Sequence, residues 1–289
     1  MTTIMTEQQM QQKILRREPF EATIDTGGFR VKIEHYNVPV IVAAIHNGGN
    51  LRADLLENCL LTQDERLFEE DPHTDDFIQD QPITFIGNDS RYEYDLNRDE
   101  SECLYEEAWG KPVWKTPLTD DQKAKSLEKH RQFFRLGTLL AESLRQEFGA
   151  CLLIGTHSYN WRRRTEAHCP VLNVGTSTVT NPEWRPVIDK WVGELNKIEV
   201  EGMDIDAKEN DVFFGHGFCA TYCHANFDNV LVLATEFKKV YMDERTGESF
   251  PEVVQQLRVG YDKAIKQVTD EFMHVIKGDI GPVSLDYSI

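Results

Sequence analysis

Short apolar runs bounded by turn residues predict at least six buried strands in this chain. The runs are rich in β-branched residues, which favour the half-buried surface of a sheet. They lie at residues 29–33, 38–45, 83–86, 151–154, 171–174 and 230–234. Their nearly continuous apolar character is typical of strands covered on both faces.

Longer segments with apolar residues every three or four positions predict helices between these strands. They lie at residues 51–61, 119–146 and 251–276, and two more begin at Asp71-Pro72 and Asn181-Pro182-Glu183. Thr119-Asp-Asp-Gln reads as a helix start, and so does Asp71-Pro72, because Asp accepts bonds from free N–H groups and Pro suits the first helical position. Alternating strands and helices predict an α/β fold with a mixed sheet.

Neither an internal repeat nor a low-complexity linker divides the chain, so we expect a single domain over residues 1–289. Residues 1–20 read as a polar N-terminal extension and residues 278–289 as a C-terminal tail. Residues 99–118, which are acidic and contain Trp109 and Trp114, read as a long loop. Long loops inside compact domains are often lids or binding loops.

Charge and composition exclude several classes of partner. The chain has 31 Lys and Arg against 49 Asp and Glu, a net charge of −18, which argues against nucleic acids and anionic membrane surfaces. No apolar stretch approaches the roughly 20 residues that span a bilayer, and residues 1–17 lack the apolar core of a signal peptide. Six irregularly spaced cysteines do not form a disulfide framework. We therefore expect a cytoplasmic protein.

Cys219, Cys223 and His224 form a short cluster of metal-capable residues. Structural zinc sites of this kind need a second cysteine pair, which the chain lacks. We therefore expect reduced, mostly buried thiols here.

Two histidines lie where apolar runs end, at His46 and His157. Ligands of open α/β sheets bind at the carboxyl ends of strands, and a catalytic zinc usually has three protein ligands. The acidic stretch 69–76 offers the third ligand. Asp71 is the first choice, because its place at a helix start fixes its direction, and Asp75 and Glu70 are the alternatives. These acids could instead simply favour the start of a helix through its dipole.

The run from Arg91 to Arg98 predicts an anion-binding site. Arg98 can bind a carboxylate through two parallel hydrogen bonds, with Asn97 donating beside it. Arg91 could do the same or polarise a carbonyl. The alternative is a structural ion pair between Asp95 and one of these arginines. The only dense basic run, residues 162–164, either steers anions towards the site or is a solvated loop.

Glu236 lies just after the apolar run at residues 230–234. If it lies near the zinc, a carboxylate in such a place would have a shifted pKa and could act as a general acid and base. The alternative is an ion pair with Lys238 or Lys239.

Together these segments resemble the N-formylglutamate amidohydrolases, distant relatives of aspartoacylase, succinylglutamate desuccinylase and the zinc carboxypeptidases. The resemblance covers about residues 38 to 245, and its most specific part is Arg-x-x-x-Asp-Leu-Asn-Arg. The matching segments are His46-Asn-Gly-Gly, Arg91…Asp95-Leu-Asn-Arg98, Thr156-His157-Ser158, Leu172-Asn-Val-Gly175-Thr176 and Glu236…Tyr241-Met-Asp-Glu244.

The resemblance implies a three-layer α/β/α fold with a mixed, mostly parallel sheet, of the phosphorylase/hydrolase type, and one Zn²⁺ per chain. The resemblance implies that His46, Asp71 and His157 are the metal ligands. It further implies that Asn97 and Arg98 bind a substrate carboxylate. Arg91 would stabilise the oxyanion, and Glu236 would be the general base. The implied reaction is hydrolysis of the linear amide of a small anionic N-acyl amino acid, with N-formyl-L-glutamate as the leading candidate.

The chain departs from the family pattern in the segments around the second histidine and before the last strand. Gly155 stands where the family often has an aspartate, and Tyr222 stands where an arginine is common. His216 is an added titratable group that we expect in the pocket. A small-peptide carboxypeptidase and a non-catalytic ligand-binding protein on the same fold are the alternative functions.

Overall fold

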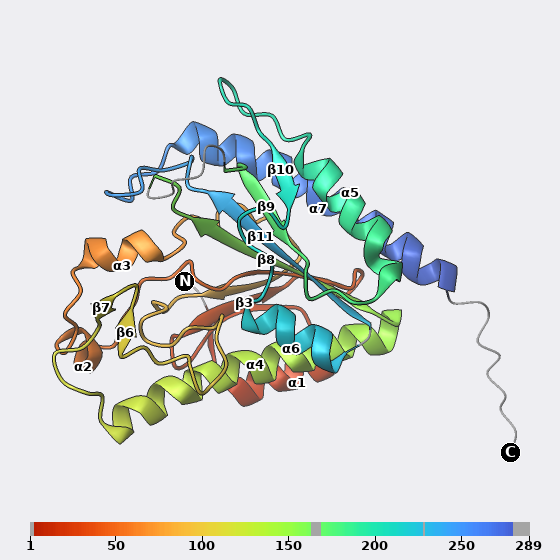
Figure 1. The fold of residues 1–289 in the computed structure, drawn as a ribbon. Helices are drawn as coiled ribbons and strands as arrows, with labels where there is room; N and C mark the ends of the chain where they lie inside the picture. The colour runs from red at the N-terminus through yellow and green to blue at the C-terminus, as the bar shows by residue number, and fades with distance from the viewer. Residues whose placement is uncertain (1–2, 163–168, 228, 280–289) are drawn as a thin grey trace, which may run out of the picture.

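A nine-stranded sheet runs through the computed structural model, which describes residues 3–162, 169–227 and 229–279 (Figure 1). In spatial order the strands are β1 (Thr3–Met5), β2 (Phe20–Ile24), β3 (Phe29–Ile33), β5 (Ile83–Gly87), β4 (Val40–Ala44), β8 (Cys151–Tyr159), β11 (Val230–Lys238), β9 (Leu172–Gly175) and β10 (Ala207–Glu209). The central strands β5, β4, β8 and β11 are parallel, whereas β3 and β9 pair antiparallel to this group. The sheet is therefore mixed with a parallel centre, as expected.

Helices cover both faces of the sheet and complete three layers (Figure 1). One face packs against α1 (Glu7–Leu15), α4 (Asp120–Phe148) and α6 (Phe218–Asn226). The opposite face packs against η1 (Pro182–Trp184), α5 (Arg185–Leu195) and α7 (Pro251–Asp279). The short helices α2 (Ala53–Leu56) and α3 (Gln63–Glu69) and the hairpin of β6 (Glu107–Ala108) and β7 (Lys111–Pro112) lie outside these layers.

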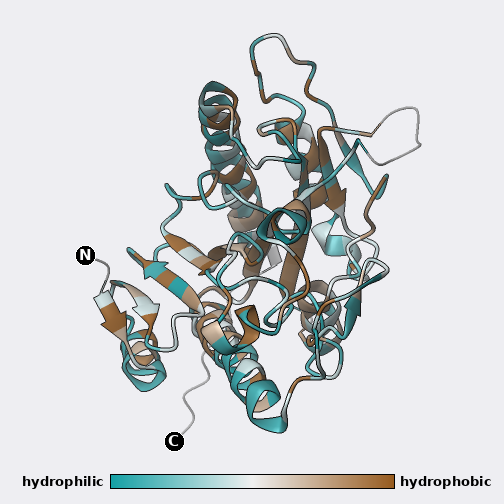
Figure 2. Cartoon of the chain, turned by 90° about the vertical axis from the view of Figure 1, so that its left-hand side faces the viewer, coloured by the Kyte–Doolittle hydropathy of each residue, from teal (hydrophilic) through white to brown (hydrophobic). Residues whose placement is uncertain are grey.

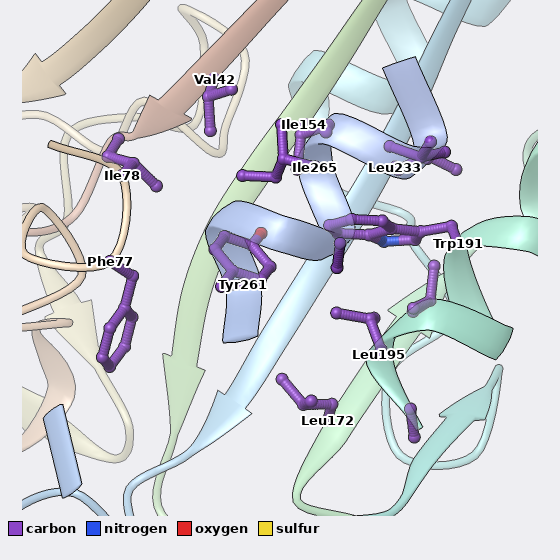
Figure 3. Packing of buried hydrophobic residues seen from close by; sticks show 14 of the residues in the cluster. Val42, Phe77, Ile78, Ile154, Leu172, Trp191, Leu195, Leu233, Tyr261 and Ile265 are labelled. Atoms are coloured by element: carbon purple, nitrogen blue, oxygen red, sulfur yellow. The ribbon is translucent and has the colours of Figure 1, made fainter. Parts of the chain in front are cut away.

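The α5/α7 face holds the larger apolar cluster, part of which Figure 3 shows. Trp191 and Tyr261 are fully buried between the helices and the sheet, and the Trp191 indole donates to the Thr235 hydroxyl at 3.1 Å. Figure 2 shows apolar residues concentrated in the inner strands, with polar residues on the outer helix surfaces. Burial of these faces is the main stabilising contribution to the layered fold.

The predicted strands are present, but β8 and β11 are longer than their apolar runs. They pair with each other in parallel over nine residues, up to Lys238 and Tyr159. The prediction that the strand stops before His157 is therefore wrong, and His157 lies inside β8. The ladder of backbone hydrogen bonds continues past the apolar part, because the polar side chains there face a cavity rather than the core.

The predicted helix starting at Asp71-Pro72 is also wrong, because residues 72–80 form successive turns. His73 has a φ of +67°, a left-handed conformation that interrupts an α-helix. The Thr74 hydroxyl also binds the Asp71 carbonyl at 2.7 Å. The predicted helix at 51–61 shortens to α2 because Cys59 pairs with Trp114 in a β-bridge.

Of the residues that we expected to form an N-terminal extension, those from Thr3 onward contribute to the layered fold. Residues 3–5 form β1, parallel to β2. In α1, Met10 and Ile14 are fully buried against α4 and the sheet. Thr6 and Thr119 begin α1 and α4 with capping boxes, as the sequence at Thr119 predicted.

Part of the predicted tail, residues 280–289, lies outside the described residues. Within residues 3–162, 169–227 and 229–279, none of the helices combines the length and apolar character that crossing a bilayer requires.

Candidate active site

A cavity of about 680 Å³ opens at the carboxyl ends of β4, β8 and β11. Its volume falls in the roughly 300–1,000 Å³ range of cavities that hold small ligands. His46 follows β4 directly, and His157 pairs in register with Glu236 across β8 and β11. The parallel centre of the sheet thus brings three distant segments to one wall. All the site residues expected from the sequence line this cavity: His46, Asp71, Arg91, Asn97, Arg98, His157, His216 and Glu236.

His46, Asp71 and His157 form a buried cluster with donor atoms within 4.8 Å of one another. Asp71 Oδ2 lies 3.4 Å from His46 Nδ1 and 3.3 Å from His157 Nδ1. The other Asp71 oxygen accepts from the Ser158 hydroxyl at 3.0 Å. Burial disfavours the charged carboxylate, but the two imidazoles hold the pKa of Asp71 far below its ordinary value.

These residues fit a divalent transition metal in both donor chemistry and spacing. Two ligands at 2.0–2.1 Å from a tetrahedral Zn²⁺ lie about 3.4 Å apart, close to the two distances from Asp71 to the histidines. Two imidazoles with one carboxylate form a common catalytic zinc set. The cluster can therefore hold a metal with little rearrangement.

The two alternative carboxylates for this site are engaged elsewhere. Glu70 accepts a hydrogen bond from the buried Ser90 hydroxyl. Asp75 pairs with Arg30 on β3. The sequence alone left the three acids of this stretch open. Of the three, Asp71 lies beside the two histidines, and its N–H donates to the His46 carbonyl at 2.9 Å.

Asp95 is a site residue that the sequence analysis treated only as an ion-pair partner. Its fully buried carboxylate lies 2.7 Å from His46 Nε2 and 2.7 Å from Arg91 Nη2. It also accepts from the Tyr105 hydroxyl and from the Asn97 N–H. Burial disfavours its charge, yet Arg91 and His46 hold the pKa of Asp95 well below its ordinary value.

Asp95 therefore fixes the His46 ring so that Nδ1 points at Asp71. Burial and Arg91 lower the pKa of His46, but Asp95 and Asp71 outweigh them and raise it. Metal-ligating histidines commonly donate their second ring N–H to a carboxylate in this way. The place of Asp95 in the Arg91 to Arg98 motif, two residues before Asn97, is the sequence signal that could have identified this role.

Arg91 combines an ion pair with exposure to the cavity. It contacts Asp95 through Nε and Nη2 and donates Nη1 to the Glu69 carbonyl at 3.1 Å. Its guanidinium lies 4.9 Å from the Trp109 ring centroid. Burial favours its neutral form, but Asp95 keeps the pKa of Arg91 raised. The alternative of an Arg91–Asp95 ion pair is thus confirmed, and the arginine remains a charged wall of the cavity.

Asn97 and Arg98 line the cavity beside the start of α6. The Asn97 carbonyl accepts from Phe218 N–H at 3.2 Å, and a side chain at Gly217 would collide with the Asn97 amide. Glycine at 217 therefore lets α6 approach this wall. Within the described part of the chain, no carboxylate pairs with the Arg98 guanidinium, whose Nη1 donates to the Asn97 carbonyl at 2.9 Å.

His216, just before α6, and Tyr222, within α6, lie in different surroundings. His216 lines the cavity, and its Nε2 lies 2.8 Å from the Ser177 hydroxyl. Tyr222 is 37% exposed on the outer side of α6, where it contacts Phe218 and Phe227. Tyr222, which stands where the family commonly has an arginine, does not line the cavity, whereas its neighbour Thr221 does.

Two lysines follow Glu236 along the chain, Lys238 as the last residue of β11 and Lys239 directly after it. Lys239 donates to the Phe68 and Glu70 carbonyls at 2.8 and 2.7 Å and thereby anchors the chain that carries Asp71. Burial lowers the pKa of Lys239 to about 8. Lys238 donates to the Cys169 carbonyl at 3.1 Å.

The long segment 99–118 folds around the cavity mouth, to which it contributes Asp99, Glu102 and Trp109. Of the basic run, Arg163 and Arg164 lie outside the described residues, and Arg162 lies 3.7 Å from Asp243. All six cysteines are free, as expected.

The fold and this site define the class: a three-layer α/β protein with a metal-capable His-Asp-His cluster at the carboxyl edge of its sheet. The family model for N-formylglutamate amidohydrolase matches residues 38–242. The chain therefore belongs to the N-formylglutamate amidohydrolase family.

Two solved structures share the fold. One is N-formylglutamate amidohydrolase from Ralstonia eutropha JMP134, with 17% identity and a TM-score of 0.66 over 87% of this chain and 97% of that one. The other is gene product Atu2144 from Agrobacterium tumefaciens, with 15% identity and a TM-score of 0.57 over 83% of this chain and 96% of that one. No curated protein matches the chain.

Proposed function

We propose that this protein is a zinc-dependent amidohydrolase that cleaves the linear amide of an N-acyl amino acid. The observation that carries the proposal is one cavity lined by the His46/Asp71/His157 cluster, the Glu236 carboxylate and Arg98. Membership of the family supports amide hydrolysis as the reaction class. N-formyl-L-glutamate, which the family's name contains, is the first substrate to test.

His46, Asp71 and His157 would hold one Zn²⁺ per chain. When bound, the ion supplies a Lewis acid that polarises the acyl carbonyl and favours ionisation of water. The described chain prepares this site through Asp95, which orients His46, and through Lys239, which anchors the chain bearing Asp71.

Glu236 is the proposed general base and acid. It pairs with His157 across the strands, at the cavity wall. It takes a proton from the attacking water as the water oxygen bonds to the acyl carbon, and it delivers that proton to the nitrogen as the C–N bond breaks. The products are the free amino acid and a carboxylate, which is formate for an N-formyl substrate.

Arg98 and Asn97 would bind the carboxylate of the amino acid, and Arg91 would face the negative charge that develops on the acyl oxygen. A planar guanidinium matches a carboxylate through two parallel hydrogen bonds. Arg98 suits this role because no described carboxylate pairs with it. Fixing the carboxylate presets the position of the scissile amide, which lowers the entropic part of the barrier.

Formate release from N-formyl-L-glutamate, with and without a chelator and with zinc restored, tests the proposal. We expect turnover that the chelator abolishes and zinc restores. Glu236→Gln should lower kcat by about 10²–10⁴-fold with zinc content unchanged, whereas the exposed control Glu201→Gln should retain full activity. Failure of the zinc-loaded protein to hydrolyse N-formyl or N-acetyl amino acids would refute the amidohydrolase. Cleavage of short peptides instead would indicate a carboxypeptidase.

A further inference from the structure

The cavity continues beneath the metal-capable cluster into the α4/α6 side of the sheet. Two residues before His157 and Glu236 along β8 and β11, small residues lie side by side across four strands. In register they are Ala43 on β4, Gly155 on β8, Ala234 on β11 and Gly175 on β9. All four line the cavity. The small side chains of Ala43, Gly155 and Ala234 leave space where larger ones would fill the layer between sheet and helices, whereas Gly175 is small because the Gly215 backbone packs directly against it.

The next row down bounds this space with larger apolar side chains, Ile41, Leu153 and Val232. Leu153 and Ala234 lie on two central strands, yet both are only half-buried. A central-strand residue beneath two helices is normally fully buried, so their exposure shows that the cavity reaches them. We call this lower part of the cavity the apolar recess.

Two helices close the apolar recess opposite the sheet. α4 contributes Phe133 and Gly137, and α6 contributes Cys219 and Ala220. Gly137 lies in the middle of α4, and a Cβ built on it would meet no atom within 4 Å. Glycine destabilises a helix interior, and no neighbouring atom requires the absence of a side chain at position 137. The open space beside Gly137 therefore belongs to the cavity.

The charged groups of the cavity lie above the recess, at the strand ends and in the loops. Among the described residues, the walls of the recess carry no ionisable side chain except the thiol of Cys219, whose pKa is raised well above its ordinary value by Cys223 and by burial. A carboxylate entering the recess would lose its hydration without gaining a cation, which is strongly unfavourable. An alkyl group would gain free energy there by leaving water.

The position of the carboxylate-binding pair indicates which part of a substrate enters. Leu96 lines the cavity directly before Asn97 and Arg98, and Gly217 next to Asn97 leads into the α6 residues that close the recess. The Cα atom of an amino acid carries both its carboxylate and its side chain. A carboxylate held at Arg98 therefore places the side chain at the entrance of the recess.

We propose that the apolar recess binds the side chain of the substrate's amino acid, and that the preferred substrates are N-acyl amino acids with an unbranched or branched alkyl side chain rather than with a second carboxylate. This inference rests on the proposed function for the position of the amide. It differs from that function in replacing glutamate by an apolar amino acid.

The direct comparison uses N-formyl-L-norleucine and N-formyl-L-glutamate, whose side chains have similar lengths but different charge. We expect kcat/KM to be at least about ten-fold higher for the norleucine compound, and to rise about four-fold with each methylene added to N-formyl-L-alanine. Binding of L-norleucine and L-glutamate to metal-free and zinc-loaded protein, measured by calorimetry, gives a readout that does not require turnover.

A matched pair of helix variants locates the effect. Gly137→Leu fills the recess from α4, whereas Gly193→Leu adds the same side chain to an exposed site on α5 where a Cβ also meets no atom within 4 Å. Gly137→Leu should lower kcat/KM for N-formyl-L-norleucine at least about ten-fold and leave N-formyl-L-alanine within about two-fold. Gly193→Leu should change neither. Gly137→Ala, which favours the helix, should give a smaller loss in the same direction.

The outcomes separate the two proposals. Preference for N-formyl-L-glutamate, or equal effects of Gly137→Leu on short and long substrates, would overturn the recess and leave the amidohydrolase standing. If no N-formyl compound is hydrolysed but Gly137→Leu weakens norleucine binding, the amidohydrolase falls and the ligand class of the recess is supported. If neither amino acid binds and neither N-formyl compound is hydrolysed, the recess inference is overturned as well.

Discussion

Asp95→Asn changes one oxygen to an amide nitrogen at the most connected side chain of the site. On one side, Asp95 Oδ1 lies 2.7 Å from His46 Nε2. On the other side, Oδ2 accepts from Arg91 and from the Tyr105 hydroxyl. Asparagine keeps one acceptor oxygen, so its NH₂ would face either His46 or the Arg91 and Tyr105 donors and could not accept a hydrogen bond there. The substitution also removes the single negative charge that orients His46 and balances Arg91.

The contacts and the burial of Asp95 indicate the size of both effects. Loss of a carboxylate behind a metal-binding histidine typically weakens metal affinity about 10–100-fold. Asp95 is fully buried, and breaking a buried ion pair by removing one partner costs about 3–5 kcal/mol of stability. We therefore expect a weaker zinc complex and a lower free energy of unfolding.

Zinc affinity is measured by competition with a chromophoric chelator, and stability by urea denaturation of the metal-free protein. Asp121→Asn, which alters an exposed carboxylate on α4 paired with Lys125, is the matched control and should change neither quantity. Tyr105→Phe removes a single donor to Asp95 and keeps the test available if Asp95→Asn does not fold. Zinc affinity of Asp95→Asn within about two-fold of the wild type would refute the role of this carboxylate in orienting His46.

Two further predictions concern the chain around Asp71. Asp71→Ala should abolish stoichiometric zinc binding, measured by elemental analysis after dialysis, whereas Asp75→Ala should keep it because Asp75 pairs with Arg30 instead; full zinc content in Asp71→Ala would exclude this ligand. Burial lowers the pKa of Lys239 from 10.5 to about 8, so between these pH values the unfolded chain binds more protons and this group makes stability rise with pH. Between pH 8 and pH 10, the free energy of unfolding of the metal-free protein, measured by urea denaturation, should rise less for Lys239→Met than for the wild type. An equal rise in both proteins would contradict the lowered pKa of Lys239.

Local signals in the sequence determined the long elements of this fold. The capping box at Thr119, the apolar runs of β3 and β5 and the periodicity of α7 each lie within one segment and predicted it to within a few residues. The elements that were missed or misplaced depend on contacts made elsewhere. α1 is polar except where Met10 and Ile14 pack, and the turns after Asp71 replace a helix because His73 adopts a left-handed conformation.

The sequence by itself also supplied the residue types of the site, because imidazole, carboxylate and guanidinium groups at strand ends have few other uses in combination. Only the tertiary structure shows that Asp71, rather than Asp75 or Glu70, lies beside His46 and His157. It alone placed Asp95 behind His46 and aligned Ala43, Gly155 and Ala234 into one row. The register between parallel strands brings together residues that are far apart along the chain. No periodic pattern within a single segment reveals that register, so the sequence could not predict these neighbours.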